Sequence, residues 1–180
     1  MLPTFLAFDS RLTQRIRLDR RRAGWWSLAV LLAHSGDSWL WMAGLALIWL
    51  FGDSAWQFRA ALLAISVCIQ ALAVFALKQV IRRQRPAGEW GGIYRSIDPH
   101  SFPSGHATRA ALLAVMAIGL GPGWFAAALL IWATLVSLAR VATGVHYFSD
   151  VLAGTLIGLL MGLGMLALEA PLMQWFPFLF

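Results

Sequence analysis

The chain has 180 residues, of which 60% are hydrophobic and only 12% are charged, and its mean hydropathy is +0.72. Soluble domains usually carry about 25% charged residues, so a water-soluble globular domain is nearly excluded. A membrane-spanning helix takes roughly 20 apolar residues, which leaves room for about five or six spans and little else. We therefore expect one all-α membrane domain, with the whole chain kept as mature protein.

The charge balance is strongly basic. The formal net charge is +6, and 13 of the 14 basic residues are arginine. An excess of basic residues can indicate binding to nucleic acid. Beside apolar spans, it more often indicates contact with anionic lipid headgroups and a signal that sets membrane topology. We expect membrane lipids as partners, no nucleic acid and no obligate protein partner. The single cysteine, Cys68, lies in an apolar run and can form no internal disulfide.

Residues 1–36 are predicted to form a segment at the membrane interface. Residues 5–22 mix apolar side chains with six arginines, a composition that favours an amphipathic helix among the headgroups. The apolar stretch 25–33 is short, because roughly a dozen helical residues rise under 20 Å while the hydrocarbon core is about 30 Å thick. We expect this stretch to be interfacial or half-inserted.

Uncharged windows predict five transmembrane helices, at about residues 38–53, 57–80, 104–120, 124–141 and 149–168. The turn signal Gly121-Pro122-Gly123 separates the third from the fourth. In the last helix, glycines at spacing four predict close helix packing rather than a ligand site; they are Gly154, Gly158 and Gly162. Gln70 is expected to hydrogen-bond a neighbouring helix. The predicted bundle covers residues 37–170, and residues 171–180 form a C-terminal tail.

Alternating spans place most ionisable residues on one face of the bundle, in three local motifs. The first is Lys78 followed seven residues later by Arg85 and Pro86, where a helix ends. Two cations at one helix end can bind an anion. The alternative is a basic membrane-edge cluster that only anchors headgroups, and for Arg82 and Arg83 alone we favour this alternative.

The second motif, Pro103-Ser104-Gly105-His106, enters the third predicted span. Ser104 is a good N-cap, and the N–H groups of a first helical turn favour an anion. Gly105 permits close approach of the backbone, and His106 would lie beside that anion. A merely capped helix with an interfacial histidine is an equally good interpretation of this motif alone.

The third motif places Arg140 at the end of the fourth span, with His146 and Asp150 at the start of the fifth. A carboxylate beside a histidine fixes its tautomer and makes the other ring nitrogen a better nucleophile. Asp150 could equally be a plain N-cap. Together the motifs describe a phosphate site with a nucleophile. Too few acidic residues are present for a two-metal site, and zinc spacing is absent, so no metal or other cofactor is expected.

At these positions the sequence closely resembles the type 2 phosphatidic acid phosphatase (PAP2) superfamily, over roughly residues 35–168. The resemblance implies a PAP2-like bundle and a metal-independent lipid phosphatase. It implies that His146 is the nucleophile, forming a phosphohistidine, that Asp150 orients it, and that His106 is the general acid. It also implies a set of phosphate-binding residues, namely Lys78, Arg85, Ser104, Gly105 and Arg140.

One residue departs from the family pattern, since Ala139 stands where the family has serine before the motif arginine. The alternative is therefore a catalytically weakened protein of the same fold that binds or transports lipid phosphates.

Candidate substrates of the expected phosphatase are undecaprenyl diphosphate, phosphatidate and phosphatidylglycerophosphate. We expect a multi-pass protein of the bacterial inner membrane. The resemblance to the family implies an active site on the extracytoplasmic face of the membrane. The distribution of arginines instead places the active site on the cytoplasmic face, if residues 1–35 do not span the membrane.

Overall fold

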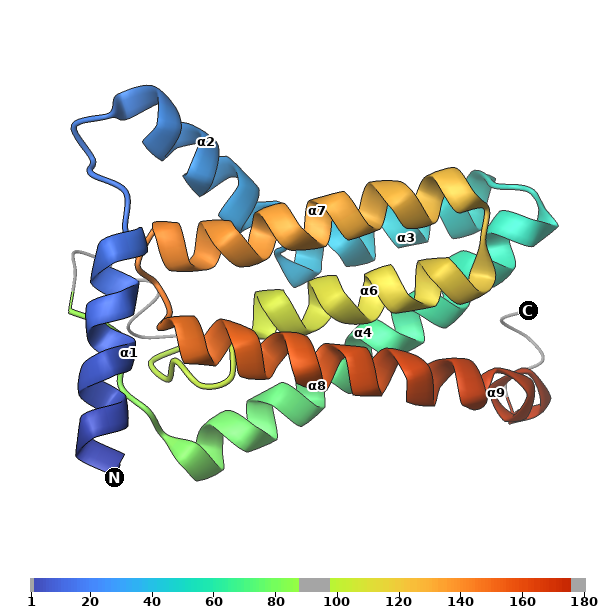
Figure 1. Ribbon diagram of the computed structural model, residues 1–180. Coiled ribbons are helices and arrows are strands. Elements are labelled where there is room, and N and C mark those ends of the chain that lie inside the picture. Colours follow the sequence, from blue (N-terminus) through green and yellow to red (C-terminus); the bar gives the residue numbers. More distant parts are fainter. Residues whose placement is uncertain (1, 88–97, 176–180) are drawn as a thin grey trace.

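The computed structural model describes residues 2–87 and 98–175, and the regular elements in these ranges are helices, with one isolated β-bridge between Gln84 and His100 (Figure 1). In chain order the helices are α1 (Leu2–Ile16), α2 (Ala23–His34), α3 (Ser38–Phe51), α4 (Ser54–Ile81), α6 (Gly105–Leu120), α7 (Gly123–Ala142), α8 (Phe148–Ala167) and α9 (Glu169–Trp175). Part of the loop between α4 and α6, residues 88–97, lies outside the described residues.

The five predicted spans correspond to α3, α4, α6, α7 and α8, and each end lies within three residues of its prediction. Three of these helices are long and apolar enough to cross a membrane, namely α4 with 28 residues and α7 and α8 with 20 each. The apolar helices α2, α3 and α6 are shorter, with 12, 14 and 16 residues. The uncharged windows of the sequence therefore predicted the helices correctly. The fold is an all-α membrane bundle.

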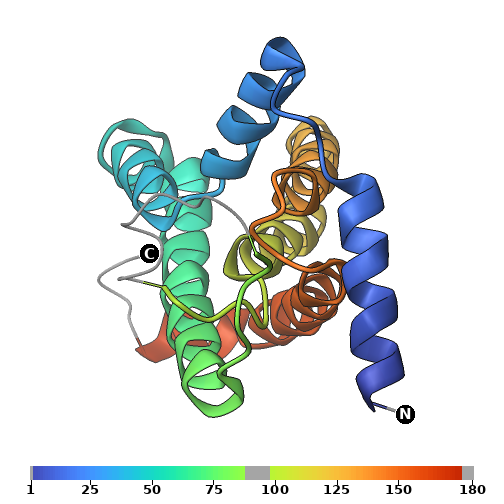
Figure 2. The ribbon, with the colours of Figure 1, turned by 90° about the vertical axis from the view of Figure 1, so that its left-hand side faces the viewer.

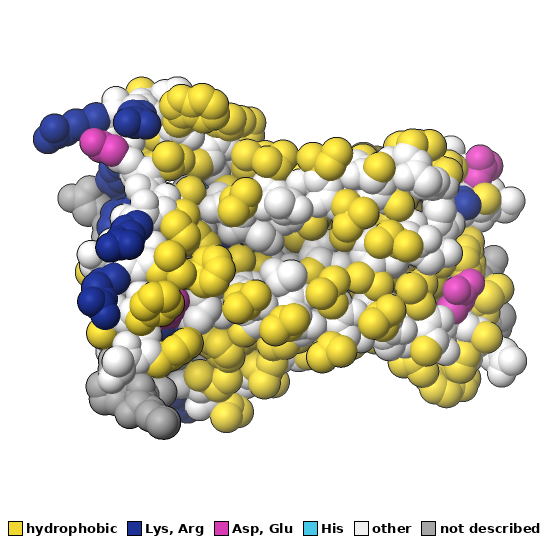
Figure 3. Space-filling model, in the orientation of Figure 1, with side chains coloured by type: hydrophobic (Ala, Val, Ile, Leu, Met, Phe, Trp, Pro, Cys, Tyr) yellow, Lys and Arg dark blue, Asp and Glu magenta, His cyan; other side chains and the backbone are white. Residues whose placement is uncertain are grey.

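The bundle helices run side by side, and α1 lies across one end of them (Figures 1 and 2). On the face drawn in Figure 3, hydrophobic side chains cover the flank of the bundle, and lysine and arginine side chains gather at the end that α1 crosses. The opposite end holds Arg59, whose Nε donates to the carbonyl oxygens of Leu120 at 3.0 Å and Gly121 at 2.9 Å. The bundle thus has one strongly basic end.

Helix α6 lies at the centre of the bundle, where Leu112, Leu113 and Met116 are fully buried. Helix α8 packs against it through the glycines at spacing four. A Cβ added to Gly154 would lie 2.6 Å from the carbonyl oxygen of Ser104, and one added to Gly158 would overlap that of Thr108. The small residues therefore let the two backbones touch, as the sequence predicted.

Candidate active site

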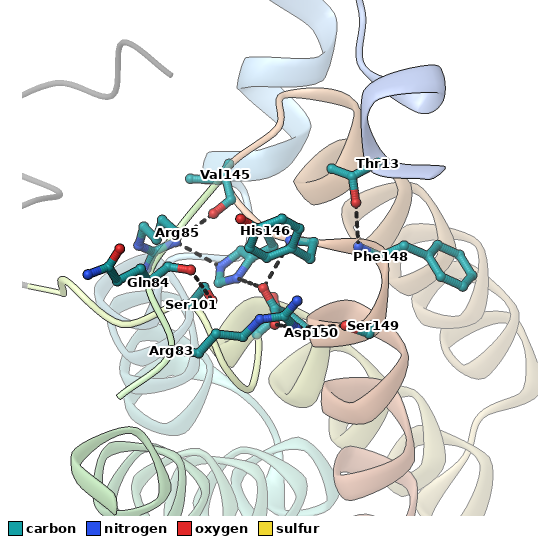
Figure 4. A network of polar contacts seen from close by, with 12 residues as sticks. Thr13, Arg83, Gln84, Arg85, Ser101, Val145, His146, Phe148, Ser149 and Asp150 are labelled. Carbon is teal, nitrogen blue, oxygen red and sulfur yellow. Dashed lines mark hydrogen bonds and ion pairs between the residues drawn. The ribbon is translucent and has the colours of Figure 1, made fainter. Parts of the chain in front are cut away.

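The three sequence motifs meet at the basic end of the bundle, beside α1. Lys78 lies in the last turns of α4, and Arg85 follows in the loop. His106 is in the first turn of α6, while His146 lies in the short turn that joins α7 to α8 (Figure 4). Helix α8 then begins, with Asp150 in its first turn. The fold brings together residues that are up to 72 positions apart in the chain.

The hydrogen bonds of His146 define its tautomer. Its side chain is 1% exposed, and Arg85 Nη1 lies 3.1 Å from its Nε2. A guanidinium can only donate, so Nε2 accepts and the ring proton resides on Nδ1. Nδ1 lies 3.6 Å from Oδ2 of Asp150 (Figure 4). The lone pair of Nε2 is therefore on the side of the cations, where an anion would bind.

The surroundings of His146 also keep the imidazole neutral. Burial lowers the pKa of His146 well below its ordinary value, and the positive charges of Arg140, Arg85 and Lys78 lower it further. A neutral imidazole has a free lone pair, whereas a protonated one has none. His146 is thus in the state that a nitrogen nucleophile requires.

Asp150 faces His146 and is not the N-cap of α8, the alternative that the sequence left open; Tyr147 occupies that position, and Asp150 takes part in the capping from the third residue of the helix. Its side chain is fully buried. Oδ2 accepts a hydrogen bond from the backbone N–H of Tyr147 at 2.9 Å and lies toward His146, while Oδ1 accepts from Arg83 Nη1 at 2.6 Å. A carboxylate fixed on both oxygens is a rigid partner for an imidazole.

Arg83 is not a headgroup anchor, and that prediction was wrong. Its side chain is only 17% exposed, and its guanidinium pairs with Asp150 and with Asp9 of α1 at 2.7 Å. The arginine also lies over the ring of Tyr147, 4.2 Å from the centroid. The chain reverses at Arg82, which has φ +49° and ends α4, and this turns Arg83 back into the protein.

The predicted phosphate-binding cations lie together and are buried. Lys78 is 6% exposed and Arg140 is 1% exposed. Asp98 lies between Lys78 and Arg85, with its carboxylate oxygens 2.5 and 2.7 Å from Lys78 Nζ and Oδ2 2.8 Å from Arg85 Nη2. Nothing in the sequence singled out Asp98. A carboxylate held by two cations shows that this place accepts an anion.

Ser104 and Gly105 lie against the same group of residues. The backbone N–H of Ser104 donates to the carbonyl oxygen of Asp150 at 3.0 Å. The Ser104 hydroxyl is buried and has no partner among the described residues, so it can serve a bound oxygen. Gln70 Nε2 donates to the carbonyl oxygen of Gly105 at 3.4 Å, the contact between helices that the sequence led us to expect.

His106 has a carboxylate partner that the sequence did not reveal. Its Nε2 lies 2.7 Å from Oδ1 of Asp37, in the turn between α2 and α3, and Oδ2 of Asp37 lies 3.3 Å from His34 Nδ1. Burial raises the pKa of Asp37, but the hydrogen bonds and charges of His106 and His34 outweigh it, and the net pKa is lowered. An ionised Asp37 accepts a hydrogen bond from Nε2–H of His106, which leaves Nδ1 of His106 for other chemistry.

The turn that carries Asp37 is fixed against α6. Arg109 of α6 donates to the carbonyl oxygen of Gly36 and to the hydroxyl of Ser38. A Cβ on Gly36 would lie 2.9 Å from Cδ2 of His106, so glycine permits the close approach. The only signal in the sequence was an aspartate before an apolar helix, which is typical of an N-cap. Asp37 is in the N-cap position of α3, but its side chain makes no capping bond.

A cavity of about 240 Å³ opens beside these groups. Lys78, Asp98 and His106 line its polar part, and Val74 and Phe75 of α4 line its apolar part. The Phe75 side chain is 61% exposed on the outer surface of the bundle. The cavity therefore joins a cationic site to a surface that faces hydrocarbon in a membrane, an arrangement that suits a molecule with an anionic head and an apolar tail.

Comparison with known proteins finds similar sequences and similar structures. An undecaprenyl-diphosphatase of Sulfolobus acidocaldarius is 33% identical over 135 residues, which cover 73% of this chain and 64% of that protein. The crystal structure of Aquifex aeolicus LpxE has a TM-score of 0.68 at 24% identity, covering 88% of this chain and 92% of that one. The first transmembrane PAP2 type phosphatidylglycerolphosphate phosphatase from Bacillus subtilis has a TM-score of 0.73 at 22% identity, covering 93% and 87%.

Both structures share the fold of the chain. The model of the PAP2 superfamily matches residues 59–173, a range that contains all three motifs. Because that range is more than half of the sequence and carries the motifs at the predicted places, the chain belongs to the PAP2 superfamily.

Proposed function

We propose that the protein is a metal-independent membrane lipid phosphatase that works through a phosphohistidine intermediate. The observation that carries this proposal is the state of His146, a buried neutral imidazole with its Nε2 lone pair toward Arg85 and its Nδ1–H toward Asp150. A site that only bound a phosphate would need the cations but not a nucleophile. Lys78, Arg85 and Arg140 supply the positive charge that holds phosphoryl oxygens.

In the first step, Nε2 of His146 attacks the terminal phosphorus and the bond to the leaving oxygen breaks. The electron pair of that bond goes to the leaving group, which His106 protonates from Nδ1. As Nε2 becomes bonded to phosphorus the imidazole gains positive charge, and Asp150 stabilises it through Nδ1–H. The cations and the Ser104 hydroxyl stabilise the charge on the phosphoryl oxygens, with the Gly105 backbone as a further ligand.

In the second step, water attacks the phosphorus of the phosphohistidine. His106, now deprotonated at Nδ1, takes a proton from the water while the P–N bond breaks and its electron pair returns to Nε2. Inorganic phosphate leaves, and both histidines regain their starting states. Asp37 holds the His106 ring throughout, and its charge favours the protonated form that acts in the first step.

We infer a lipid substrate from the cavity, which runs from Lys78 to the exposed Phe75. A phosphate at the cationic end would leave an apolar tail along α4, toward the bilayer. The relative named undecaprenyl-diphosphatase supports a polyprenyl diphosphate. Phosphatidate and phosphatidylglycerophosphate are further candidates, because the same site would take any terminal phosphate on a lipid.

We also propose how the chain sits in a membrane. The helices α3, α4, α6, α7 and α8 would span it, while α1 lies among the headgroups and α2 is half-inserted. In this arrangement residues 1–36 form the interfacial segment, residues 37–170 the catalytic bundle and residues 171–180 the tail. The homologous membrane phosphatases support a membrane location, and we propose the bacterial inner membrane.

The proposal is tested by phosphate release from a panel of lipid phosphates, with and without EDTA, using the purified protein and its His146→Ala variant. We expect release that EDTA does not change and that the variant lacks. Labelling with a ³²P-substrate and rapid quenching should trap an acid-labile, alkali-stable phosphoprotein. Release that EDTA abolishes contradicts the metal-independent mechanism, and release that persists in His146→Ala contradicts the nucleophile. Binding of lipid phosphates without any turnover would favour the weakened binding protein.

A further inference from the structure

Helix α1 has an unusual buried face. Its outward apolar side chains include Phe5 and Phe8, which are 53% and 58% exposed, yet the side chains it buries are polar. Asp9 is 2% exposed and Thr13 is 3% exposed. A buried carboxylate is strongly unfavourable unless it is paired and hydrogen-bonded. The face that α1 turns toward the protein therefore makes specific polar contacts through Asp9 and Thr13, beside the apolar packing of Ile16 at its end.

Both carboxylate oxygens of Asp9 accept hydrogen bonds, from Ser149 at the start of α8 and from Arg83. Oδ1 accepts a hydrogen bond from the backbone N–H of Ser149 at 3.0 Å. Oδ2 accepts from Arg83 Nη2 at 2.7 Å and from the Ser149 hydroxyl at 2.5 Å. Asp9 thus binds the residue that directly precedes Asp150.

Thr13 lies one turn further along α1 and contacts Phe148, the first residue of α8. Its hydroxyl oxygen accepts from the backbone N–H of Phe148 at 3.0 Å (Figure 4). The same hydroxyl donates to the carbonyl oxygen of Asp9 at 2.8 Å. The first N–H groups of a helix have no partner within the helix. At α8, side chains of α1 satisfy two of these groups, although more than 130 positions separate them in the chain.

Arg83 connects Asp9 to the candidate nucleophile. Its Nη1 donates to Asp150 and its Nη2 to Asp9, so one guanidinium is shared between two buried carboxylates. If Asp9 lost its charge, Arg83 would neutralise Asp150 alone. Asp150 would then stabilise the positive charge that develops on His146 less well. Asp9 therefore acts on the electrostatics of His146 as well as on its position.

The residues after α1 fix the other end of the same turn. The backbone N–H of Leu18 donates to the carbonyl oxygen of Ala142, the last residue of α7, at 2.9 Å. Arg17 packs on Gly144, where a Cβ would lie 3.1 Å from its side chain. Residues 9–18 thus hold both ends of the turn that carries His146.

We propose that Asp9 is a positioning residue for His146, and that α1 completes the active site from outside the bundle. The proposal rests on the proposed function, because it assigns the purpose of the contacts to the reaction of His146. Helix α1 lies outside residues 59–173, the range that the family model matches. The contacts are therefore a property of this chain beyond the three motifs.

The test compares Asp9→Asn with Asp19→Asn in the full-length protein. Both variants replace a carboxylate by an amide in the N-terminal segment, but Asp19 is exposed and its side chain accepts a local bond from the backbone N–H of Arg21. We expect Asp9→Asn to lower kcat by about 10- to 100-fold, because a small displacement of a reacting group has such an effect. The KM should stay within about twofold, since the phosphate-binding cations are unchanged. Asp19→Asn should match the wild type in both constants.

Hydrogen exchange provides a readout that does not need turnover. In Asp9→Asn the amides of Ser149 and Phe148 should exchange faster than in Asp19→Asn, while exchange at the centre of α8 is unchanged.

A kcat for Asp9→Asn within about twofold of that for Asp19→Asn overturns the proposal. If Asp9→Asn does not fold, Thr13→Val replaces it, and an unchanged kcat in that variant is the contrary result. If the wild type releases no phosphate, the proposed function fails, and unchanged exchange in Asp9→Asn would separately overturn the positioning contact.

Discussion

Asp37 accepts a 2.7 Å hydrogen bond from His106 although the two residues are 69 positions apart in the chain. Asp37 occupies the N-cap position of α3 and leaves that role unfilled, because its two oxygens face His106 and His34 instead. Asp53 is its counterpart at α4, and there the side chain does cap, accepting from the backbone N–H of Trp56 at 2.9 Å. The two aspartates thus occupy equivalent positions with different roles.

The first prediction concerns Asp37→Asn, with Asp53→Asn as the matched control. Without the carboxylate, His106 holds its proton less well and protonates a poor leaving group more slowly. We expect kcat/KM, which reports the first step, to fall by about 10- to 100-fold for an alkyl phosphate, and by less than about threefold for p-nitrophenyl phosphate, whose leaving group needs no acid. Equal losses on both esters would contradict the role of Asp37 behind the general acid. Asp53→Asn should change neither rate.

The second prediction concerns pH. Because burial and three cations lower the pKa of His146 well below its ordinary value, the imidazole should stay neutral from neutral pH down through pH 6.5, the ordinary histidine value. Replacing Arg85 by glutamine removes a positive charge beside the ring, so the pKa of His146 should rise. NMR titration of ¹⁵N-histidine-labelled protein in micelles measures the pKa of His146 in the wild type and in the Arg85→Gln variant. A wild-type His146 that becomes protonated near pH 6.5 would contradict the expectation.

The third prediction concerns Asp98→Asn. The carboxylate of Asp98 lies between Lys78 and Arg85, where a substrate phosphate would be bound, and its negative charge opposes that phosphate. Asp98 is 38% exposed, so solvent screening keeps the effect modest. We expect vanadate, a mimic of the phosphoryl transition state, to bind about three- to tenfold more tightly to the variant. Weaker vanadate binding in an inhibition assay would show that Asp98 organises the cations for the substrate instead.

The fourth prediction concerns the contact between α6 and α8. Gly158→Ala should lower stability by about 1–3 kcal/mol, because the new methyl group would overlap the backbone of α6. Gly164→Ala is the control, since a Cβ there meets nothing within 4 Å. Thermal unfolding in detergent should show a lower midpoint for the first variant alone. A midpoint for Gly158→Ala equal to that of the control would mean that the helices separate easily.

The helices and the three motifs were predictable because both are local in the chain. An uncharged window near 20 residues long specifies a helix, and a motif such as Pro103-Ser104-Gly105-His106 lies on a single turn. The carboxylates that surround these motifs were not predictable in this way. Asp9, Asp37 and Asp98 each reach the site from another element, and their partners depend on how helices cross. Arg83 was misjudged for the same reason, since its two partners are 74 and 67 positions away.

The cavity beside Lys78 bears on what happens to the products of the proposed reaction. One of its walls includes Phe75 on the outer surface of the bundle, while the cations lie at the end of the bundle near water. A dephosphorylated lipid would remain in the bilayer, and inorganic phosphate would diffuse into the aqueous phase. The two products would thus be separated as soon as they formed, which would make the reverse reaction negligible without any closing lid.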